Sequence, residues 1–585
     1  VVMGMLDLET REKIKESYDR YETYIVWGSV LVLMHGWFIA AAIINFPNSV
    51  ALLVILGLFW LYVLGWLAYT KLPWGWTDGL SAWVEARPWL STVFGVSSMV
   101  GLLALLIVFG WHSSPRLYST GCLVLLVLVA VVLSEAPARI KWRPVVSGIL
   151  LQYVLAFAVL KWNYGRIGLQ WVVDQLVTFL GYAKIGTSFV FDYIPAPPDI
   201  CGMEGPFAFT SLPILVYFAA LCAVWYYMGL IQWVLRRVAV VLQLIMGTTA
   251  AESLNAVASS LMGPTEAAGL MRYALPTMTQ SEIVVTMAVG SSMISGSLFA
   301  IYIAFGACAP MLLAANVICP TIPSMLQIFG KSYGGETCTN RSAPATLLIS
   351  KIVQPETQVS RQKDMSTFEF PPCEDLSILQ AVSNGAISAI EVVLAIIANL
   401  IVYLAALAFV DAAIQYLTGL LGFQGITFEI LVGYAFFPLA FLMGASAEAE
   451  WSAKLDETLK VAQLIGTKTV LNEFIGYQQM QGMLLRGEIH PRGQLIAVFA
   501  MCGYSNPSNI GSVLAQFVAM CPQRLKAMAA AAPKGLYIAS LACFMTACVA
   551  GSLIDDDSLA CMPDDPSENC LNLDDVVRYF NQTAF

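Results

Sequence analysis

Two glutamates, Glu266 and Glu473, stand where long apolar segments of the sequence are interrupted. Glu266 follows Gly263-Pro264-Thr265, and Glu473 follows Asn472. A carboxylate accepts hydrogen bonds from hydroxyl or ring N–H groups, and Asn and Thr side chains donate or accept them. Both glutamates lie within a few residues of a predicted helix break, where the N-terminus of a helix stabilises negative charge. These groups suit a small polyhydroxylated or heterocyclic solute.

The elements that carry these residues are predicted to lie in a membrane. Of 585 residues, 58% are hydrophobic and 12% are charged, whereas soluble domains carry about 25% charged residues. The mean hydropathy is +0.72. The apolar residues gather in runs, most of them close to the roughly 20 residues that cross a bilayer as a helix. The runs are Tyr24–Asn45, Val50–Tyr69, Trp89–Trp111, Leu117–Ser134, Val145–Leu160, Phe207–Leu235, Ile283–Gly330, Val392–Val410, Ile430–Ala447, Gln494–Gln523 and Gly535–Ile554. The sequence therefore predicts an all-α polytopic protein of the lipid bilayer.

The polar residues also have plainer interpretations. Glu266 could pair with Arg272, and Asn506 and Asn509 could join two helices by hydrogen bonds. A carboxylate is costly to place in a membrane, so a functional role is the first hypothesis for it. Pro507, between the two asparagines, favours a helix break at that point.

Several other chemistries are disfavoured. None of His35, His112 and His490 has the spacing of metal ligands, and no Walker, GxGxxG or GxSxG motif occurs in its required context. The formal charge of −9 carries no indication of a nucleic-acid partner. No charged ring or carbonyl filter of a channel is visible. We expect neither an enzyme nor a cofactor, and a secondary transporter is favoured.

Basic residues in short loops predict the orientation. If the first run crosses outward, every basic cluster that flanks the first, second, fourth and sixth runs is cytoplasmic. These clusters contain Arg11, Lys13, Lys15, Arg20, Lys71, Arg87, Arg139, Lys141, Arg143, Arg236 and Arg237. The acidic tail Asp555–Phe585 is then extracellular, and we expect the plasma membrane as the location.

The predicted outer face carries two glycosylation sequons, Asn340-Arg341-Ser342 and Asn581-Gln582-Thr583, so the protein is expected to be a glycoprotein. Disulfides are reasonable on an oxidising face. The cysteines on that face are Cys319, Cys338, Cys561 and Cys570. Cysteines within the apolar runs are interpreted as small apolar fillers, namely Cys122, Cys222, Cys502 and Cys543.

The two halves of the chain share one pattern. In the first half, the helix-forming stretch Val238–Leu261 meets the break at Gly263–Glu266, and a span interrupted at Ser291–Ser297 follows. In the second half, Thr469–Phe474 interrupts a pair of helices, and a span broken at Tyr504–Ser512 follows. Such matched interruptions are typical of inverted-repeat transporters. Because unwound backbone in a membrane must be buried or line a cavity, we expect two re-entrant hairpins and two broken transmembrane helices around a polar site.

Ordered motifs in the sequence resemble the concentrative nucleoside transporter family. They are "YYMGLIQWVLRRVAVVLQLIMGTTAAESLNAVASSLMGPTEAAGLMRYALPTMTQSE", "SFVFDY", "ISGSLFAIYIAFG", "FLMG", "LIGTKTVLNEFIGYQ", "MCGYSNPSNIGSVL" and "ACFMTACVAG". The resemblance runs from about Val145 to Leu553, and the leading spans resemble the extra N-terminal helices of the eukaryotic branch. It implies a homotrimer in which a transport domain moves as an elevator against a scaffold domain.

This resemblance divides the chain into eight segments. They are a cytoplasmic segment (1–23), N-terminal transmembrane helices (24–162), an interfacial and a scaffold helix (163–237), the first hairpin and broken helix (238–315), an insertion and cytoplasmic loop (316–375), scaffold helices (376–452), the second hairpin and broken helix (453–554), and an extracellular tail (555–585). Within these segments, Trp162–Gly186 is predicted as an amphipathic interfacial helix. Thr321–Arg341 is interpreted as an inserted surface loop, and Ile352–Leu376 as a polar cytoplasmic loop.

The resemblance also implies a nucleoside site between the two hairpin tips. The substrate-binding residues would be Pro264, Thr265, Glu266, Glu473, Tyr504, Asn506 and Asn509. In the family the first tip faces the nucleobase, whereas the second-tip glutamate and the broken-helix asparagine face the ribose. Pro264 stands where the family has a glutamine, Asn509 where it has a serine, and Tyr504 where it usually has a phenylalanine, so base selectivity is expected to differ.

The implied sodium site departs further from the family pattern. Ser259 stands where the family has an asparagine, and Met262 where a smaller residue contributes its carbonyl. Met293 replaces a hydroxyl residue before the retained Ile294. A thioether is a poor ligand for Na⁺. Sodium symport, proton coupling through a tip glutamate and uncoupled transport remain alternatives. So do a carrier of another small polar solute and a transport-inactive subunit of a larger membrane assembly.

Overall fold

The computed structural model describes residues 113–195, 205–246, 248–294, 301–303, 307–318, 344–361 and 375–554, the stretch 32–40, and a few other positions. Several predictions lie outside these residues. They concern the spans before residue 113 apart from 32–40, both sequons, the four cysteines of the outer face, the insertion and the tail. The chain forms two compact units, residues 1–82 with 323–335 and the remainder. In the first unit, Trp60 Nε1 donates a hydrogen bond to His35 Nε2 at 2.5 Å.

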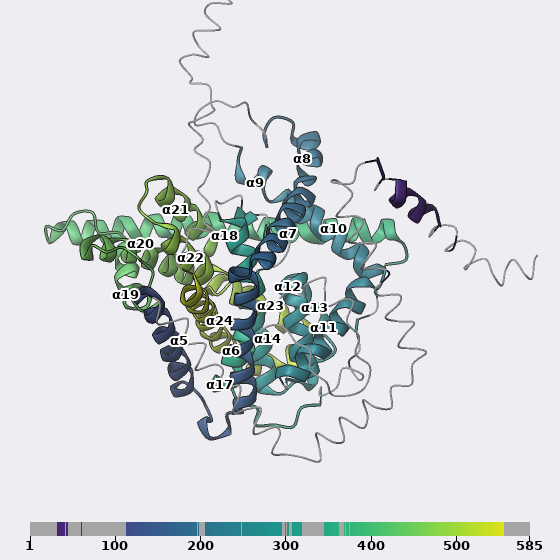
Figure 1. Cartoon of the computed structure of the whole chain (residues 1–585), viewed down its shortest axis with the longest axis horizontal. Helices are drawn as coiled ribbons and strands as arrows, with labels where there is room; N and C mark the ends of the chain where they lie inside the picture. The colour runs from purple at the N-terminus through teal and green to yellow at the C-terminus, as the bar shows by residue number, and fades with distance from the viewer. Residues whose placement is uncertain are drawn as a thin grey trace, which may run out of the picture. The chain divides into compact units, whose positions relative to one another are not determined.

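In the described part of the second unit every regular element is helical (Figure 1). The α-helices are α5 (Ser114–Val132), α6 (Trp142–Ala156), α7 (Asn163–Gly181), α8 (Ala183–Phe191), α9 (Phe207–Thr210), α10 (Pro213–Tyr227), α11 (Leu230–Met246), α12 (Ala250–Leu261), α13 (Pro264–Leu270), α14 (Gln280–Ser292), α16 (Ala309–Ile318), α17 (Pro344–Val353), α18 (Ile378–Leu420), α19 (Phe428–Leu442), α20 (Trp451–Val470), α21 (Glu473–Leu485), α22 (Pro491–Met501), α23 (Pro507–Met520) and α24 (Leu525–Leu553). Five described stretches are long and apolar enough to cross a membrane, namely Ser114–Val132, Pro144–Lys161, Phe207–Tyr227, Ile378–Leu420 and Pro522–Leu553. The predicted all-α polytopic class is confirmed.

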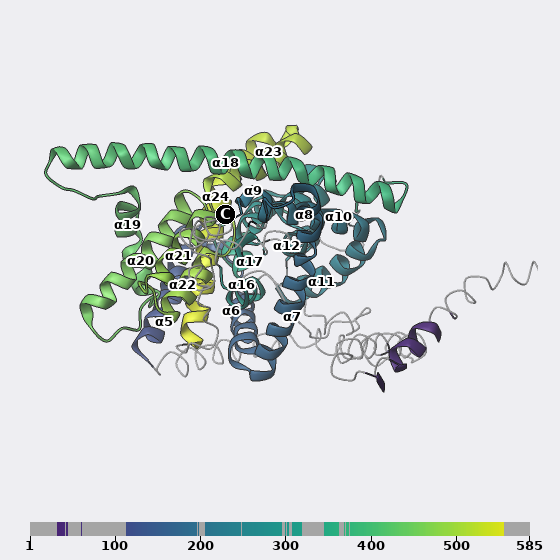
Figure 2. The same cartoon turned by 90° about the horizontal axis from the view of Figure 1, so that it is seen from above.

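The longest of these stretches, α18, has 43 residues and extends well beyond the predicted run Val392–Val410. Its N-terminus is capped by Ser377, whose hydroxyl accepts a hydrogen bond from the backbone of Gln380. At 1.5 Å per residue the helix is roughly 65 Å long. Figure 2 shows it crossing one side of the unit, with α10 beside it. The two helices approach closely at Gly385, where a Cβ atom would lie 2.6 Å from the Cβ of Ala223.

The helix α24 is largely buried, and it packs against α5, α14 and α22. A Cβ atom at Gly551, near its C-terminus, would lie 2.7 Å from the hydroxyl of Ser119 in the first turns of α5. Near the other end of α24, Lys534 donates a hydrogen bond to Glu135, which follows α5. The two helices are therefore antiparallel, as the alternating spans predict.

Three predicted boundaries differ from the structure. Val238–Leu261 is not one helix, because α11 ends at Met246 and Thr249 caps α12. The Thr249 hydroxyl and the Glu252 carboxylate each accept a hydrogen bond from the other residue's backbone, which forms a capping box. Trp162–Gly186 is likewise divided, between α7 and α8. Ile352–Leu376 begins within α17 and continues into a partly buried turn. As predicted, the apolar-run cysteines Cys122, Cys222, Cys502 and Cys543 are buried.

Candidate functional site

In each half of the chain a helix pair is interrupted at the predicted tip, and a further helix ends where the sequence predicts a broken span. The pairs α12–α13 and α20–α21 are interrupted at Met262–Gly263 and Leu471–Asn472. The helix α14 ends at Ser292, and α22 and α23 are separated by 502–506. The second break is shorter than the predicted Tyr504–Ser512, because Asn506 caps α23 and the helix resumes at Pro507.

The ends of α14 and α22 touch each other. Gly503 has φ +95°, and a Cβ atom there would lie 2.3 Å from the carbonyl oxygen of Ser292. Gly263, the residue before α13, has φ +113°. Only glycine adopts such angles readily. The glycines therefore permit the sharp breaks that bring the two halves together.

Glu473 is held at the centre of these breaks. It is the first residue of α21 and is 1% exposed. Its Oε1 atom accepts a hydrogen bond from the hydroxyl of Tyr302 at 3.0 Å, and its Oε2 atom accepts one from Asn506 Nδ2 at 2.8 Å. Asn472 caps the helix by accepting a hydrogen bond from the backbone of Ile475 at 3.0 Å. The carboxylate thus lies at a helix N-terminus with two fixed donors, and each oxygen retains a lone pair for a further donor.

The asparagines of α23 extend this polar surface. Asn506 Oδ1 accepts a hydrogen bond from the backbone N–H of Asn509 at 2.9 Å, which fixes the Asn506 amide group. Asn509 Nδ2 donates to the hydroxyl of Ser291 on α14 at 3.4 Å. The structure therefore brings Glu473, Asn506 and Asn509 together, from sequence positions up to 36 residues apart.

Aromatic rings surround the same carboxylate. The ring of Tyr302 lies 5.2 Å from that of Phe474, 5.1 Å from that of Tyr477 and 6.1 Å from that of Tyr504, between centroids. These are ordinary distances for packed aromatic pairs. Tyr504, predicted to line the site, is buried among these rings.

A cavity of about 600 Å³ opens beside these groups. Its size is within the usual range for small-molecule sites. It is lined by Met262 and Gly263 before α13, by Asn472 and Glu473, by α23 from Asn506 to Gln516, and by α10 and α18. Residues of both chain halves therefore line one cavity, which α10 and α18 also border, and its carboxylate and amide side chains come from the second half.

The backbone of the first tip can be located in the fold. Pro264, Thr265 and Glu266 form the first turn of α13, so the predicted position of Glu266 at a helix N-terminus is confirmed. Gly263 before this turn and Gly269 within the helix line the cavity. The contacts of the three side chains with a solute stay predictions.

The residues of the predicted sodium site lie at the ends of α12 and α14. Ser259 is buried in the last turn of α12, and within the part of the chain that the structure describes its hydroxyl oxygen has no hydrogen-bond partner. Met262 follows this helix, and Met293 and Ile294 follow α14 and are buried. One hard oxygen and two thioethers are thus present, and whether they bind Na⁺ stays a prediction.

The prediction missed three polar residues of the site. Tyr302 donates a hydrogen bond to Glu473, and no sequence feature distinguishes it from the other residues of its apolar segment. Lys468 is fully buried and donates a hydrogen bond to Ser505 in the break before α23. A lysine within the apolar stretch "LIGTKTV" was a visible signal. Glu391, on α18, lines the opposite wall of the cavity.

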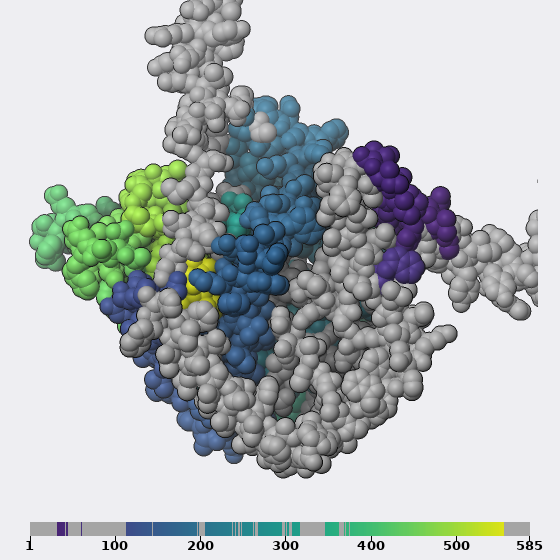
Figure 3. Space-filling model, in the orientation of Figure 1, coloured from purple at the N-terminus to yellow at the C-terminus, as the bar shows by residue number. Residues whose placement is uncertain are grey.

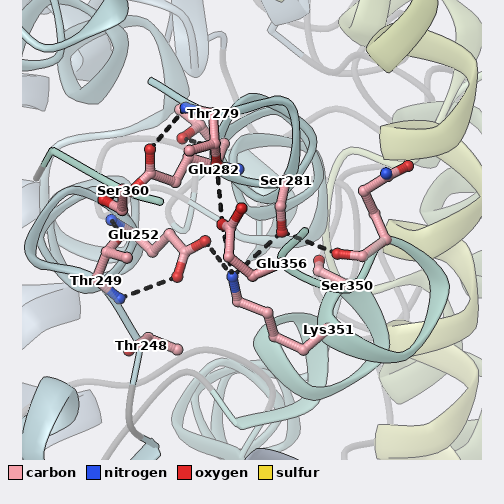
Figure 4. Close-up of polar contacts among 12 residues, drawn as sticks. Thr248, Thr249, Glu252, Thr279, Ser281, Glu282, Ser350, Lys351, Glu356 and Ser360 are labelled. Carbon is pink, nitrogen blue, oxygen red and sulfur yellow. Dashed lines mark hydrogen bonds and ion pairs between the residues drawn. The ribbon is translucent and has the colours of Figure 1, made fainter. Parts of the chain in front are cut away.

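A second buried polar group, here called the Lys351 cluster, lies at the other ends of α12 and α14 (Figure 4). Lys351 Nζ lies 2.5 Å from Glu252 Oε1 and 3.8 Å from Glu356 Oε2. Its side chain is 10% exposed, and that of Glu252 is 0% exposed. Glu282 accepts hydrogen bonds from Thr279 and Ser360. The cluster therefore joins α12, α14, α17 and the turn after α17.

The charged side chains of the Lys351 cluster lie at helix ends of opposite partial charge. Glu252 and Glu282 lie in the first turns of α12 and α14, and Lys351 lies in the last turn of α17, where opposite helix charges stabilise them. The 12 residues of α12 separate this cluster from the tip, a distance of roughly 18 Å. The cluster therefore lies at the end of α12 that is far from the tip.

Comparison with known families assigns three parts of the chain. Residues 121–194 match the family described as "Na+ dependent nucleoside transporter N-terminus", and residues 339–551 match "Na+ dependent nucleoside transporter C-terminus". Residues 208–309 match the family "Gate", described as "Nucleoside recognition".

Curated relatives cover most of the chain. Sodium/nucleoside cotransporter 1 of Oryctolagus cuniculus is 33% identical over 544 residues, which is 90% of this chain and 77% of that protein. Sodium/nucleoside cotransporter 2 of Rattus norvegicus is 31% identical, and the match covers 93% of this chain and 80% of that protein. Solute carrier family 28 member 3 of Homo sapiens is 30% identical over 91% of this chain and 74% of its own length.

Solved structures of CNTnw have the same fold. One in an inward-facing, substrate-bound state is 28% identical, with a TM-score of 0.65, and the match covers 75% of this chain and 98% of that chain. A CNTnw variant in an outward-facing state gives a TM-score of 0.66 at 28% identity, covering 75% of this chain and 99% of that one.

Proposed function

Because the chain belongs to the concentrative, Na⁺-dependent nucleoside transporter family, whose members are transporters rather than enzymes, we propose that it carries nucleosides across a membrane. The observation that carries this proposal is the buried Glu473, held by Tyr302 and Asn506 at the wall of a cavity. A carboxylate accepts two hydrogen bonds from a vicinal diol, and a ribose offers one.

We propose roles for the tip residues on this basis. Glu473 and Asn506 bind the ribose hydroxyls, and Thr265 and Glu266 read the nucleobase edge. Pro264 offers no side-chain amide, so the base is read by fewer groups than in relatives with a glutamine there. Tyr504 and Asn509 line the remaining wall.

We also propose that the protein depends on sodium less strongly than relatives that carry an asparagine in place of Ser259. The unpartnered hydroxyl of Ser259 supports a cation site, and the thioethers of Met262 and Met293 weaken it. Proton coupling and uncoupled transport are the competing forms, and each predicts a different pattern of uptake.

An elevator mechanism fits the position of the cavity. Its one wall is formed by the broken helices and its other wall by α10 and α18, so we propose that these walls belong to a transport and a scaffold domain. The outer surface of α18 is strongly apolar, with exposed Ile401, Val402 and Phe409. Such a surface suits lipid or a neighbouring copy, which supports a homotrimer, and we propose the plasma membrane as its location. We also propose that the outer face is glycosylated and that the N-terminus is cytoplasmic.

Uptake of labelled uridine and adenosine into cells expressing the protein tests both parts. Uptake should exceed that of cells without the protein, and it should fall only partly when sodium is replaced by choline at neutral pH. A strong rise at acidic pH without sodium would show proton coupling instead. Absence of nucleoside uptake, with the protein present at the surface, would favour another solute or a transport-inactive subunit.

A further inference from the structure

Three side chains from separate elements lie close together at a place outside the cavity of Glu473. Glu448 comes from the loop between α19 and α20, Glu457 from α20, and His490 from the residue that precedes α22. One ligand atom of each residue lies within 4.8 Å of the others. None of the three lines the cavity of Glu473.

The distances match those of a bound metal ion. His490 Nδ1 lies 3.5 Å from Glu448 Oε1 and 3.4 Å from Glu457 Oε1. Two ligands at about 2.1 Å from a tetrahedral Zn²⁺ are about 3.4 Å apart. The histidine and each carboxylate therefore already have the spacing of ligands of one ion.

Glu457 supplies an independent indication of a missing partner. It is 3% exposed, and its Oε2 atom is buried with no hydrogen-bond partner among the described residues. Its Oε1 atom accepts a hydrogen bond from the backbone N–H of His490 at 2.8 Å, which holds the carboxylate against the start of α22. Gly493 makes this approach possible, because a Cβ atom there would lie 2.6 Å from the same oxygen. Buried polar atoms without a partner are uncommon.

In the described part of the chain, the basic residues that neighbour these two carboxylates in the sequence contact other groups. Lys454 lies over the ring of Tyr118, and Lys460 pairs with Glu488 at 3.5 Å. The guanidinium of Arg492 donates to the carbonyl oxygens of residues 444, 551 and 554. A dication would balance both carboxylates.

We propose that Glu448, Glu457 and His490 bind a divalent transition-metal ion of the Zn²⁺ class, with water as a fourth ligand. One imidazole and two carboxylates suit Zn²⁺ or Co²⁺, whereas Ca²⁺ and Mg²⁺ prefer sites made of oxygen alone. His490 is 55% exposed and Glu448 is 36% exposed, so an ion has access from solvent. Figure 3 shows the green atoms of α20 on the surface, beside the dark-blue atoms of α5. The ion would fasten α20 to the start of α22.

The test uses the full-length protein in detergent, purified with a tag that contains no histidine and freed of metal with a chelator. Isothermal titration with Zn²⁺ should show one saturable site per chain, and Co²⁺ should give the visible absorption of a tetrahedral complex. His490→Ala and Glu448→Gln should each weaken Zn²⁺ binding by roughly tenfold or more. The matched control is Asp456→Asn, which removes an exposed carboxylate next to Glu457 and should leave binding unchanged.

A second readout separates lost binding from lost folding. Zn²⁺ should raise the unfolding temperature of the unaltered protein and of Asp456→Asn, but not that of His490→Ala, whose unfolding temperature without metal should equal that of the unaltered protein. Equal Zn²⁺ affinity in the His490→Ala variant, or no saturable binding to the unaltered protein, would overturn the proposal and leave a histidine–carboxylate contact only.

Discussion

Replacement of Lys351 by methionine tests whether the Lys351 cluster anchors the first hairpin. The change keeps most of the side-chain volume and removes the ammonium that pairs with Glu252, whose side chain is 0% exposed. Breaking a buried ion pair by removing one partner costs about 3–5 kcal/mol, because the remaining charge is buried without compensation. Glu356, at 3.8 Å from the lost ammonium, adds to the unbalanced negative charge.

The matched control is Lys460→Met, since Lys460 pairs with Glu488 but their side chains are 28% and 27% exposed. Exposed pairs contribute about 0–1 kcal/mol. Thermal unfolding of the purified variants in detergent should therefore show a much lower unfolding temperature for Lys351→Met than for Lys460→Met. The double variant Lys351→Met with Glu252→Gln should recover part of the loss, because no unpaired charge remains between the two positions. Equal unfolding temperatures of the two single variants would refute this reasoning.

Three further predictions concern the break at Gly503, the C-terminal end of α5 and the predicted sodium site. Gly503→Ala should abolish uptake and lower the unfolding temperature, because the φ of +95° at Gly503 and the nearby backbone of α14 exclude a side chain. The control is Gly511→Ala, where a Cβ atom meets nothing within 4 Å, and this variant should behave as the unaltered protein in the same assays. The hydrogen bond from Lys534 holds the pKa of Glu135 below its ordinary value, so this pair stabilises the folded state above pH of about 4.3 and is lost as the pH falls through the lowered value. Glu135→Gln should thus lower the unfolding temperature slightly at pH 7 and by less as the pH is brought below about 4.3, and an effect that grew on acidification would contradict this sign. Ser259→Asn should make uridine uptake depend more steeply on sodium concentration, and an unchanged dependence would remove this position from the ion site.

Much of the fold follows from local features of the sequence. Apolar runs and the breaks at Gly263 and Gly503 are visible because a membrane helix needs a continuous apolar stretch and a positive φ needs glycine. Caps such as Asn472 and Asn506 are short-range signals as well. The start of α12 was missed because Thr249 and Glu252 form a capping box within an apparently continuous helical stretch.

The remaining parts of the site depend on contacts between distant segments. Tyr302 and Asn506 meet at one carboxylate although they are 204 residues apart. The ligand set of Glu448, Glu457 and His490 has no recognisable spacing, since a loop, a helix and a helix cap each contribute one residue. Lys351 was not predicted as a functional or structural site because it precedes a segment interpreted as a loop and because its partner Glu252 lies on another helix. Such pairs become visible only in three dimensions.

Uptake of labelled uridine by the purified protein in liposomes, compared between the unaltered protein and Glu473→Gln, tests the central claim most directly. The neutral amide lacks the negative charge and one of the two acceptor oxygens that a carboxylate offers to a ribose diol. Its NH₂ group would also face a hydrogen-bond donor, either the hydroxyl of Tyr302 or the amide of Asn506. The control is Glu450→Gln, at an exposed position before α20. We predict saturable uptake by the unaltered protein and by the control, and a loss of at least roughly tenfold in Glu473→Gln, as expected for a buried charged hydrogen bond. Equal uptake by Glu473→Gln and the unaltered protein would contradict the assignment of this cavity as the nucleoside site.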